Sequence, residues 1–105
     1  MNHISIIGKI SEKPKLTIVK TPLSEKAMVV FKVLDPGLPY QTTTPDEYEV
    51  HFMKDAANHI FKYMTLEKEI VVFGYMKRDK QKRDVYINAE YIQFTGKPVK
   101  EVLNV

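Results

Sequence analysis

The sequence of 105 residues contains no cysteine and only four glycines. Without cysteine, the chain cannot form a disulfide-stapled scaffold, a cysteine-ligated zinc site or a thiol nucleophile. The glycines are widely separated, at positions 8, 37, 74 and 96, so no glycine-rich loop can cradle a phosphate group. No serine lies in a Gly-x-Ser-x-Gly turn, and the three histidines show no metal-ligand spacing. These absences argue against an enzyme, and we predict neither a cofactor nor a metal site.

The sequence also lacks a long apolar segment. Its longest apolar-rich run, Ile70–Met76, is far shorter than the roughly 20 residues that a membrane-spanning helix needs. The opening residues have no basic start, no long apolar stretch and no small-residue cleavage site, so they do not resemble a signal peptide. We therefore expect no association with a membrane and a cytoplasmic location, which the absence of cysteine also suits.

The composition is typical of a folded domain, and its excess charge is confined to one segment. Hydrophobic residues make up 44% and charged residues 28% of the chain, close to the globular average. The length allows about one domain. The formal net charge is +3, and residues 77–84 (Lys-Arg-Asp-Lys-Gln-Lys-Arg-Asp) hold five cations and two anions. The rest of the chain is therefore neutral overall.

Alternation of apolar and polar residues with a period of two predicts strands. We expect five of them, over Asn2–Ile10, Ala27–Leu34, Tyr48–Met53, Glu69–Lys77 and Val85–Phe94. A turn at Lys13–Pro14 would separate the first strand from a continuation at Leu16–Val19. Gly8, inside the first strand, suggests a bulge or a tight bend.

The period changes between the third and fourth predicted strands. Four apolar residues there follow the spacing of one helix stripe, which predicts a helix over Asp55–Met64: Ala57, Ile60, Phe61 and Met64. Residues 35–47, with three prolines, predict a long loop. This order predicts a mainly β protein, a five-stranded OB-fold barrel with one helix between strands 3 and 4. A split α+β fold with the same elements is the alternative. We assign residues 1–96 to the OB-fold domain and residues 97–105 to a short C-terminal tail.

Four segments, in order and spacing, resemble one protein family. They are the apolar alternation of Asn2–Ile10, the Glu-aromatic pair opening Glu47–Val50, the helix end and glycine-closed strand of Ile60–Gly74, and the last strand at Ala89–Phe94. Over residues 2–95 they resemble the single-stranded-DNA-binding proteins of bacteria and their phages. The resemblance implies an OB-fold that binds single-stranded DNA and assembles as a dimer or tetramer.

The sequence departs from that family in three ways. It has no tryptophan, whereas many members stack bases on tryptophan. Glu67–Lys68 stands where the family usually has a glycine before the fourth strand. The final segment, Lys97–Val105, has no acidic tip of the kind that recruits partner proteins. These departures imply a minimal member, such as one from a phage or mobile element, and leave open whether it engages replication or recombination proteins.

Binding a single strand requires cations that follow the phosphates and flat side chains that stack on the bases, as in single-stranded-DNA-binding OB-folds. The candidate cations lie in the charged segment: Lys77, Arg78, Lys80, Lys82 and Arg83. Charging a hairpin tip to prevent aggregation is the alternative explanation. Scattered lysines could extend the positive path or be only solvated: Lys9, Lys13, Lys15, Lys20 and Lys32.

The candidate stacking residues are aromatic side chains of the strands and of the long loop: Tyr40, Tyr48, Phe73, Tyr75 and Tyr86. Tyr48 shares the core phase of its strand, but strand ends often twist outward. In the fourth strand, the face with Val72 and Gly74 is the better core face, so Phe73 and Tyr75 point outward. Phe73 could instead pack in a subunit interface, and Tyr40 could only anchor its loop. In the third strand, Glu49 would share the outward face and repel phosphate there.

We therefore predict a protein that binds single-stranded DNA with little sequence preference and protects it during replication, recombination or repair. Its partners would be single-stranded DNA and further copies of itself, paired through Ile4, Ile6 or Ile7 of the first strand. The alternative is an OB-fold protein-interaction module acting as a replication accessory subunit. The missing tryptophans and Glu49 favour this alternative, and the charged segment favours nucleic acid.

Overall fold

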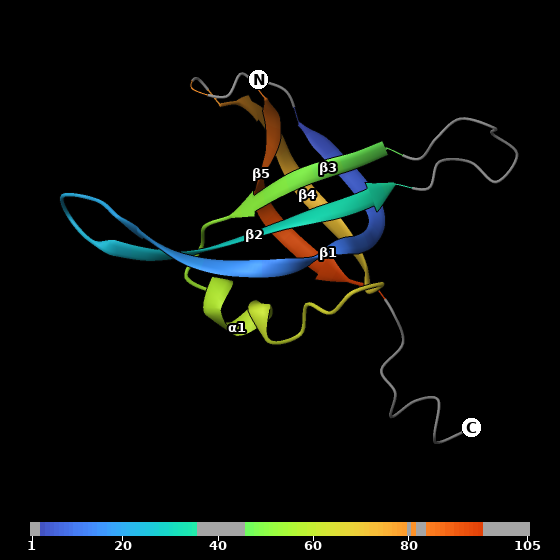
Figure 1. Ribbon diagram of the computed structural model, residues 1–105, viewed down its shortest axis with the longest axis horizontal. Coiled ribbons are helices and arrows are strands. Elements are labelled where there is room, and N and C mark those ends of the chain that lie inside the picture. Colours follow the sequence, from blue (N-terminus) through green and yellow to red (C-terminus); the bar gives the residue numbers. More distant parts are fainter. Residues whose placement is uncertain (1–2, 36–45, 80, 82–83, 96–105) are drawn as a thin grey trace, which may run out of the picture.

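Five strands form one closed barrel in the order β1-β2-β3-β5-β4 (Figure 1). The computed structural model describes residues 3–35, 46–79, 81 and 84–95. Its elements are β1 (Ile4–Lys20), β2 (Glu25–Asp35), β3 (Asp46–Phe52), α1 (Ala57–Phe61), β4 (Glu69–Arg78) and β5 (Val85–Phe94). The pairing of β3 with β5 is parallel, and the other pairings are antiparallel. The predicted five-stranded OB-fold barrel with a helix between strands 3 and 4 is confirmed, and the split α+β alternative is wrong.

The first strand is continuous, so the predicted turn at Lys13–Pro14 is wrong. β1 runs for 17 residues, and its register with β2 shifts between Ile10 and Glu12 and again between Glu12 and Lys15. A bulge leaves a residue unpaired, and proline lacks the N–H group that regular pairing would use. Pro14 therefore bends the strand without ending it.

The two glycines of the barrel stand where backbones approach closely. A Cβ on Gly8 would lie 2.4 Å from the carbonyl oxygen of Leu34, and one on Gly74 would lie 2.2 Å from that of Asn88. Gly8 pairs regularly with Ile70, so it does not form the suggested bulge. The register of β4 with β5 instead shifts between Phe73 and Gly74. Each glycine is thus required by the strand lying against it.

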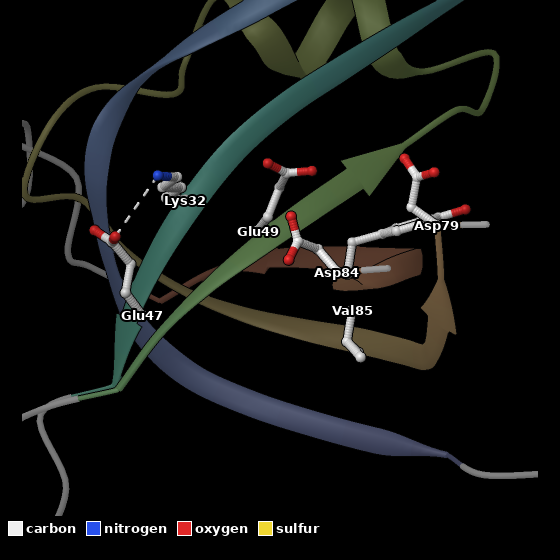
Figure 2. A pocket seen from close by; sticks show the side chains of 7 residues that line it. Lys32, Glu47, Glu49, Asp79, Asp84 and Val85 are labelled. Atoms are coloured by element: carbon white, nitrogen blue, oxygen red, sulfur yellow. Dashed lines mark ion pairs between the residues drawn. The ribbon is translucent and has the colours of Figure 1, made fainter. Parts of the chain in front are cut away.

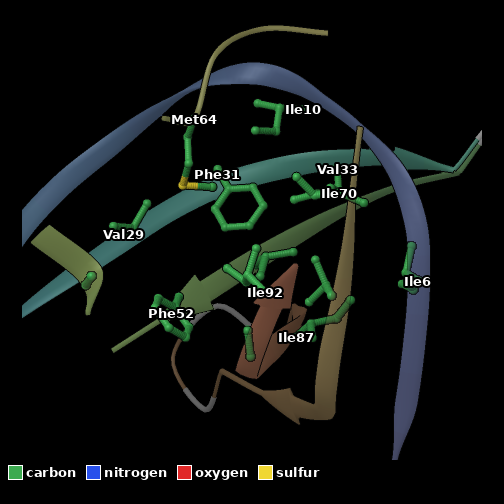
Figure 3. Packing of buried hydrophobic residues seen from close by; sticks show 14 residues of the cluster. Ile6, Ile10, Val29, Phe31, Val33, Phe52, Met64, Ile70, Ile87 and Ile92 are labelled. Carbon is green, nitrogen blue, oxygen red and sulfur yellow. The ribbon is translucent and has the colours of Figure 1, made fainter. Parts of the chain in front are cut away.

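Alternate residues of all five strands fill the barrel with apolar side chains (Figure 3). The buried set includes these residues: Ile6, Ile10, Val29, Phe31, Val33, Val50, Phe52, Ile70, Val72, Ile87, Ala89 and Ile92. The strand phases expected for β3 and β4 are confirmed, with Val50 and Val72 inside the barrel.

The helix covers one end of the barrel and is shorter than predicted. α1 spans Ala57–Phe61 instead of residues 55–64. Its apolar stripe faces the core as expected, because Ala57 and Met64 are buried and Ile60 and Phe61 pack against them. After α1, the N–H of Tyr63 donates to the Ile60 carbonyl at 2.9 Å. This three-residue spacing is tighter than that of an α-helix, so the last part of the predicted helix is a turn.

The connection from α1 to β4 contains a residue in the left-handed region. Glu67 has a φ of 71°, a conformation that costs a residue with a Cβ about 1–2 kcal/mol. The N–H of Glu67 donates to the Ile10 carbonyl at 2.9 Å, and the N–H of Ile10 donates to the Lys68 carbonyl at 3.0 Å. These bonds hold the turn against β1, in the position where the sequence lacks an expected glycine.

Replacing Glu67 with glycine should therefore stabilise the protein. Glu67→Gly should raise the free energy of unfolding by about 0.5–1 kcal/mol, because glycine adopts positive φ without strain but loses more backbone entropy on folding. Urea denaturation measures the difference. Glu67→Ala is the matched control, since it removes the carboxylate but keeps the Cβ. Equal stabilisation by both substitutions would contradict the backbone explanation.

Candidate nucleic-acid interface

A row of outward side chains crosses all five strands of the barrel. Lys77 of β4 lies opposite Tyr86 of β5, and Tyr86 contacts His51 of β3. His51 lies opposite Val30 of β2, which lies opposite Lys15 of β1. We call these five residues the transverse row. Because neighbouring strands lie about 4.8 Å apart, the row extends about 19 Å along the surface, with a cation at each end and two rings in the middle.

The two rings of the transverse row form a stack. The centroids of His51 and Tyr86 are 4.1 Å apart, and their planes differ by 18°. The Nε2 atom of His51 lies 2.6 Å from Oε2 of Glu49, in hydrogen-bonding contact. This contact fixes the orientation of the His51 ring, so the stack is preformed on the outer side of the barrel.

Two adjoining hollows extend beside the transverse row. The larger, of about 310 Å³, is lined by Lys32, Glu47, Glu49, Asp79, Asp84, Val85 and Tyr86 (Figure 2). The smaller, of about 90 Å³, is lined by Glu12, Lys13, Lys15, Val30, Phe31, Lys32 and Glu49. They meet at Lys32 and Glu49, and together we call them the groove. The groove therefore runs from the β4–β5 hairpin to the bend of β1.

Carboxylates predominate in the centre of the groove. The ammonium group of Lys32 lies 3.3 Å from Glu12 and 3.8 Å from Glu47. Ser11 also donates a hydrogen bond to Glu47 at 2.8 Å. The hydrogen bond to Glu12 and the charges of Glu12 and Glu47 raise the pKa of Lys32, so it stays protonated. Its charge is thus partly neutralised, whereas Lys13 and Lys15 at one end of the groove are exposed.

The fourth strand places its predicted residues near the other end of the groove. Tyr75 is half-buried and points outward, as expected from the core phase of β4. The ammonium group of Lys77 lies 5.5 Å from the centroid of the Tyr75 ring, within range of a cation–π interaction. Arg78 ends the strand and is exposed. Lys77 thus lies beside both Tyr75 and Tyr86, and Arg78 is the next residue along the strand.

Two predicted aromatic residues lie away from the transverse row. Tyr48 is half-buried against the core, and this burial, with the charges of Asp46 and Asp35, raises its pKa. Phe73 is 40% exposed, and its ring centroid lies 5.8 Å from that of Tyr91. Phe73 shares its surface with other apolar side chains, and we call this set the outer apolar patch: Ile7, Val71, Phe73 and Tyr91.

Four predicted site residues lie outside the described part of the chain: Tyr40, Lys80, Lys82 and Arg83. At the base of the hairpin that carries three of them, the N–H of Asp79 donates to the carbonyl of Asp84 at 2.8 Å. Within the described ranges, no group of three or more His, Asp or Glu residues could hold a metal ion. No helix there is long and apolar enough to cross a membrane.

Sequence reasoning did not select His51 or Tyr91 as site residues. The alternation in β3 places His51 outside the barrel, but only the pairing of β3 with β5 brings it against Tyr86. Tyr91 follows a register shift in β5, which puts it in an outward position that a regular alternation does not indicate. Predicting the surroundings of either residue would have required knowledge of the strand pairing.

The sequence matches no protein-family model and no curated protein, but the fold matches solved structures. The SSB domain of a Synechococcus sp. protein gives a TM-score of 0.72 at 16% identity, covering 89% of this chain and 94% of that one. A small single-stranded DNA-binding protein from Streptomyces coelicolor gives 0.65 at 15% identity, covering 90% and 95%. The N-terminal domain of PriB from Thermoanaerobacter tencongensis, described as dimeric, gives 0.64 at 14% identity, covering 91% and 98%. The resemblance is thus confirmed at the level of the fold.

The ring stack should contribute measurably to stability. Substituting His51 and Tyr86 by alanine, singly and together, should give a coupling energy of about 0.5–1.5 kcal/mol in the free energy of unfolding, because stacked rings interact beyond their area burial. A second cycle with His51 and Tyr75, which are separated by β5, should be nearly additive. Similar coupling in both cycles would show that the stack has no specific contribution.

Proposed function

We propose that the protein binds single-stranded DNA across the groove, without requiring a defined sequence. The observation that supports this most is the transverse row, in which two stacked rings lie between cations. Stacking rings and backbone-following cations are the two elements that sequence-tolerant binding needs. A structure that shares the fold, from Streptomyces coelicolor, is described as a small single-stranded DNA-binding protein.

The two ends of the groove have the charge to hold phosphates. Lys77 and Arg78 lie at the β4–β5 hairpin, and Lys13 and Lys15 lie at the bend of β1. We propose that Lys80, Lys82 and Arg83 extend the first of these ends. The bases would then lie between the two ends, on Tyr86, His51 and Tyr75. Covering a strand in this way would protect it during replication, recombination or repair, and we propose no catalytic role.

We further propose that copies of the protein associate through the outer apolar patch. Ile7 is 61% exposed, Tyr91 56% and Phe73 40%, and neighbouring strands bring them onto one surface. Of the three isoleucines expected in a contact, Ile6 is buried and Ile4 is half-buried, so Ile7 is the one that is most available. Exposed apolar surface shared by several residues is typical of an interaction site.

A protein-interaction module remains the second candidate. The carboxylates in the centre of the groove favour it, because they oppose a phosphate backbone lying there. The outer apolar patch is compatible with either candidate. Measuring DNA binding at several salt concentrations separates the two candidates.

Binding should weaken with salt through the cations at the hairpin. For single strands, each neutralised phosphate contributes about −0.7 to the slope of log K against log salt. Replacing Lys77 and Arg78 with glutamine should therefore make the slope less steep by about 1.4. Fluorescence anisotropy with a mixed-sequence oligonucleotide at several salt concentrations measures it. Lys62→Gln, beyond α1, is the control and should change little. No binding even at low salt would favour the protein-interaction candidate.

The outer apolar patch should control the oligomeric state. A charge within it would be buried on association, so Ile7→Lys should shift the protein towards a 12.2 kDa monomer, since burying an unpaired charge is costly. Light scattering at micromolar concentration gives the mass. Leu23→Lys is a matched control, because Leu23 is 96% exposed at the β1–β2 turn. A wild-type protein that is already monomeric would contradict this proposal and leave DNA binding intact.

A further inference from the structure

Glu49 is a carboxylate in the middle of a groove that is proposed to bind a phosphate backbone. It lies on the outer face of β3, its side chain is 45% exposed, and it lines both hollows of the groove. Lys32 lies opposite Glu49 across the β2–β3 pairing, yet its ion pairs are with Glu12 and Glu47. The Glu49 carboxylate instead contacts the ring of His51. A carboxylate has about four acceptor positions, so Glu49 keeps acceptor capacity facing the groove.

The ring stack and this carboxylate form one unit. Oε2 of Glu49 lies 2.6 Å from Nε2 of His51, so the carboxylate is held at the edge of the His51 ring. The His51 and Tyr86 rings are nearly parallel. A base that extends this stack therefore brings its own edge towards Glu49. Stacking alone does not distinguish the bases, because every base has a π-face. A hydrogen-bond acceptor fixed at the edge of the base does distinguish them.

The charge of the groove sets the orientation of a bound strand. Glu47, Glu49 and Asp84 line the larger hollow, so a phosphate would be repelled from its centre. Phosphates are instead attracted to the lysines at the two ends. A strand that crosses the groove must therefore turn its bases, which are neutral, towards the carboxylates. This arrangement places base edges within reach of Glu49.

We propose that Glu49 is a specificity-determining residue that favours cytosine over thymine at the Tyr86–His51 stack. The exocyclic amino group of cytosine donates hydrogen bonds, and glutamate accepts from it. Thymine presents a carbonyl oxygen at the same place, which a carboxylate repels. Cytosine and thymine stack over similar areas. The difference in affinity between them therefore reports the hydrogen bond at the base edge. This inference rests on the proposed binding of single-stranded DNA and adds a base preference to it.

The test compares oligo-dC and oligo-dT of equal length, at neutral pH and one salt concentration, by fluorescence anisotropy. We expect the wild-type protein to bind oligo-dC about 5- to 10-fold more tightly, the low end of what a good base-edge contact contributes. In Glu49→Gln the ratio should fall to about one, because an amide both donates and accepts. Removing a negative charge should also tighten binding to both oligonucleotides. This common effect cancels in the ratio of the two affinities.

Glu90→Gln is the matched control. Glu90 is exposed on β5 and is not among the residues lining the groove, so the same change of charge should leave the dC-to-dT ratio as in the wild type. Equal binding of the two oligonucleotides by the wild type, or a preference for oligo-dT, would overturn the inference but not the proposed function. A preference for oligo-dC that persists in Glu49→Gln would also overturn it. Failure of both oligonucleotides to bind would overturn the proposed function, and this inference with it.

Discussion

Closure of the barrel depends on β1 pairing with two different strands. Lys9 stands at the crossing, since it lies opposite both Leu34 of β2 and Glu69 of β4. Next to it, Gly8 leaves the space that the Leu34 carbonyl occupies, and any larger residue would push β2 away. The register shifts that follow let the same strand turn and continue along β2. The transverse row follows the other four strand neighbours, from β4 through β5, β3 and β2 to the part of β1 beyond this crossing.

The sequence predicts which face of a strand a residue lies on but not which residue lies beside it. Alternation correctly placed Val72 inside and Tyr75 outside, because burial of apolar side chains imposes a period of two. The contact of His51 with Tyr86 instead depends on the parallel pairing of β3 with β5, between segments distant in the chain. Pro14 misled the prediction for a related reason. Proline marks a break in pairing, and a bulge breaks pairing without ending the strand.

The role expected for Glu49 from the sequence differs from the role that its position in the structure indicates. From the sequence, a glutamate on the outer face counts against nucleic-acid binding, because it repels phosphate. In the structure, Glu49 holds the His51 ring and lies between two groups of lysines. The charges that could be predicted from the sequence, those of Lys77 and Arg78, lie at one end of the groove. What could not be predicted is that Lys32, in the middle of this path, is paired with Glu12 and Glu47, whereas Lys13 and Lys15 at one end are exposed.

In the proposed binding, the free energy would have two parts with different physical origins. Contacts between lysines and phosphates release counterions, so they weaken as salt rises. Stacking on Tyr86 and His51, and a hydrogen bond at the base edge, release few ions. Raising the salt concentration should therefore reduce the affinity for every strand while leaving the ratio between bases nearly constant. Repulsion by the carboxylates acts over about 8 Å at physiological salt, comparable with the spacing of two strands. Salt would therefore weaken the repulsion at the centre of the groove and the attraction at its ends together, and the ratio between bases would depend least on salt.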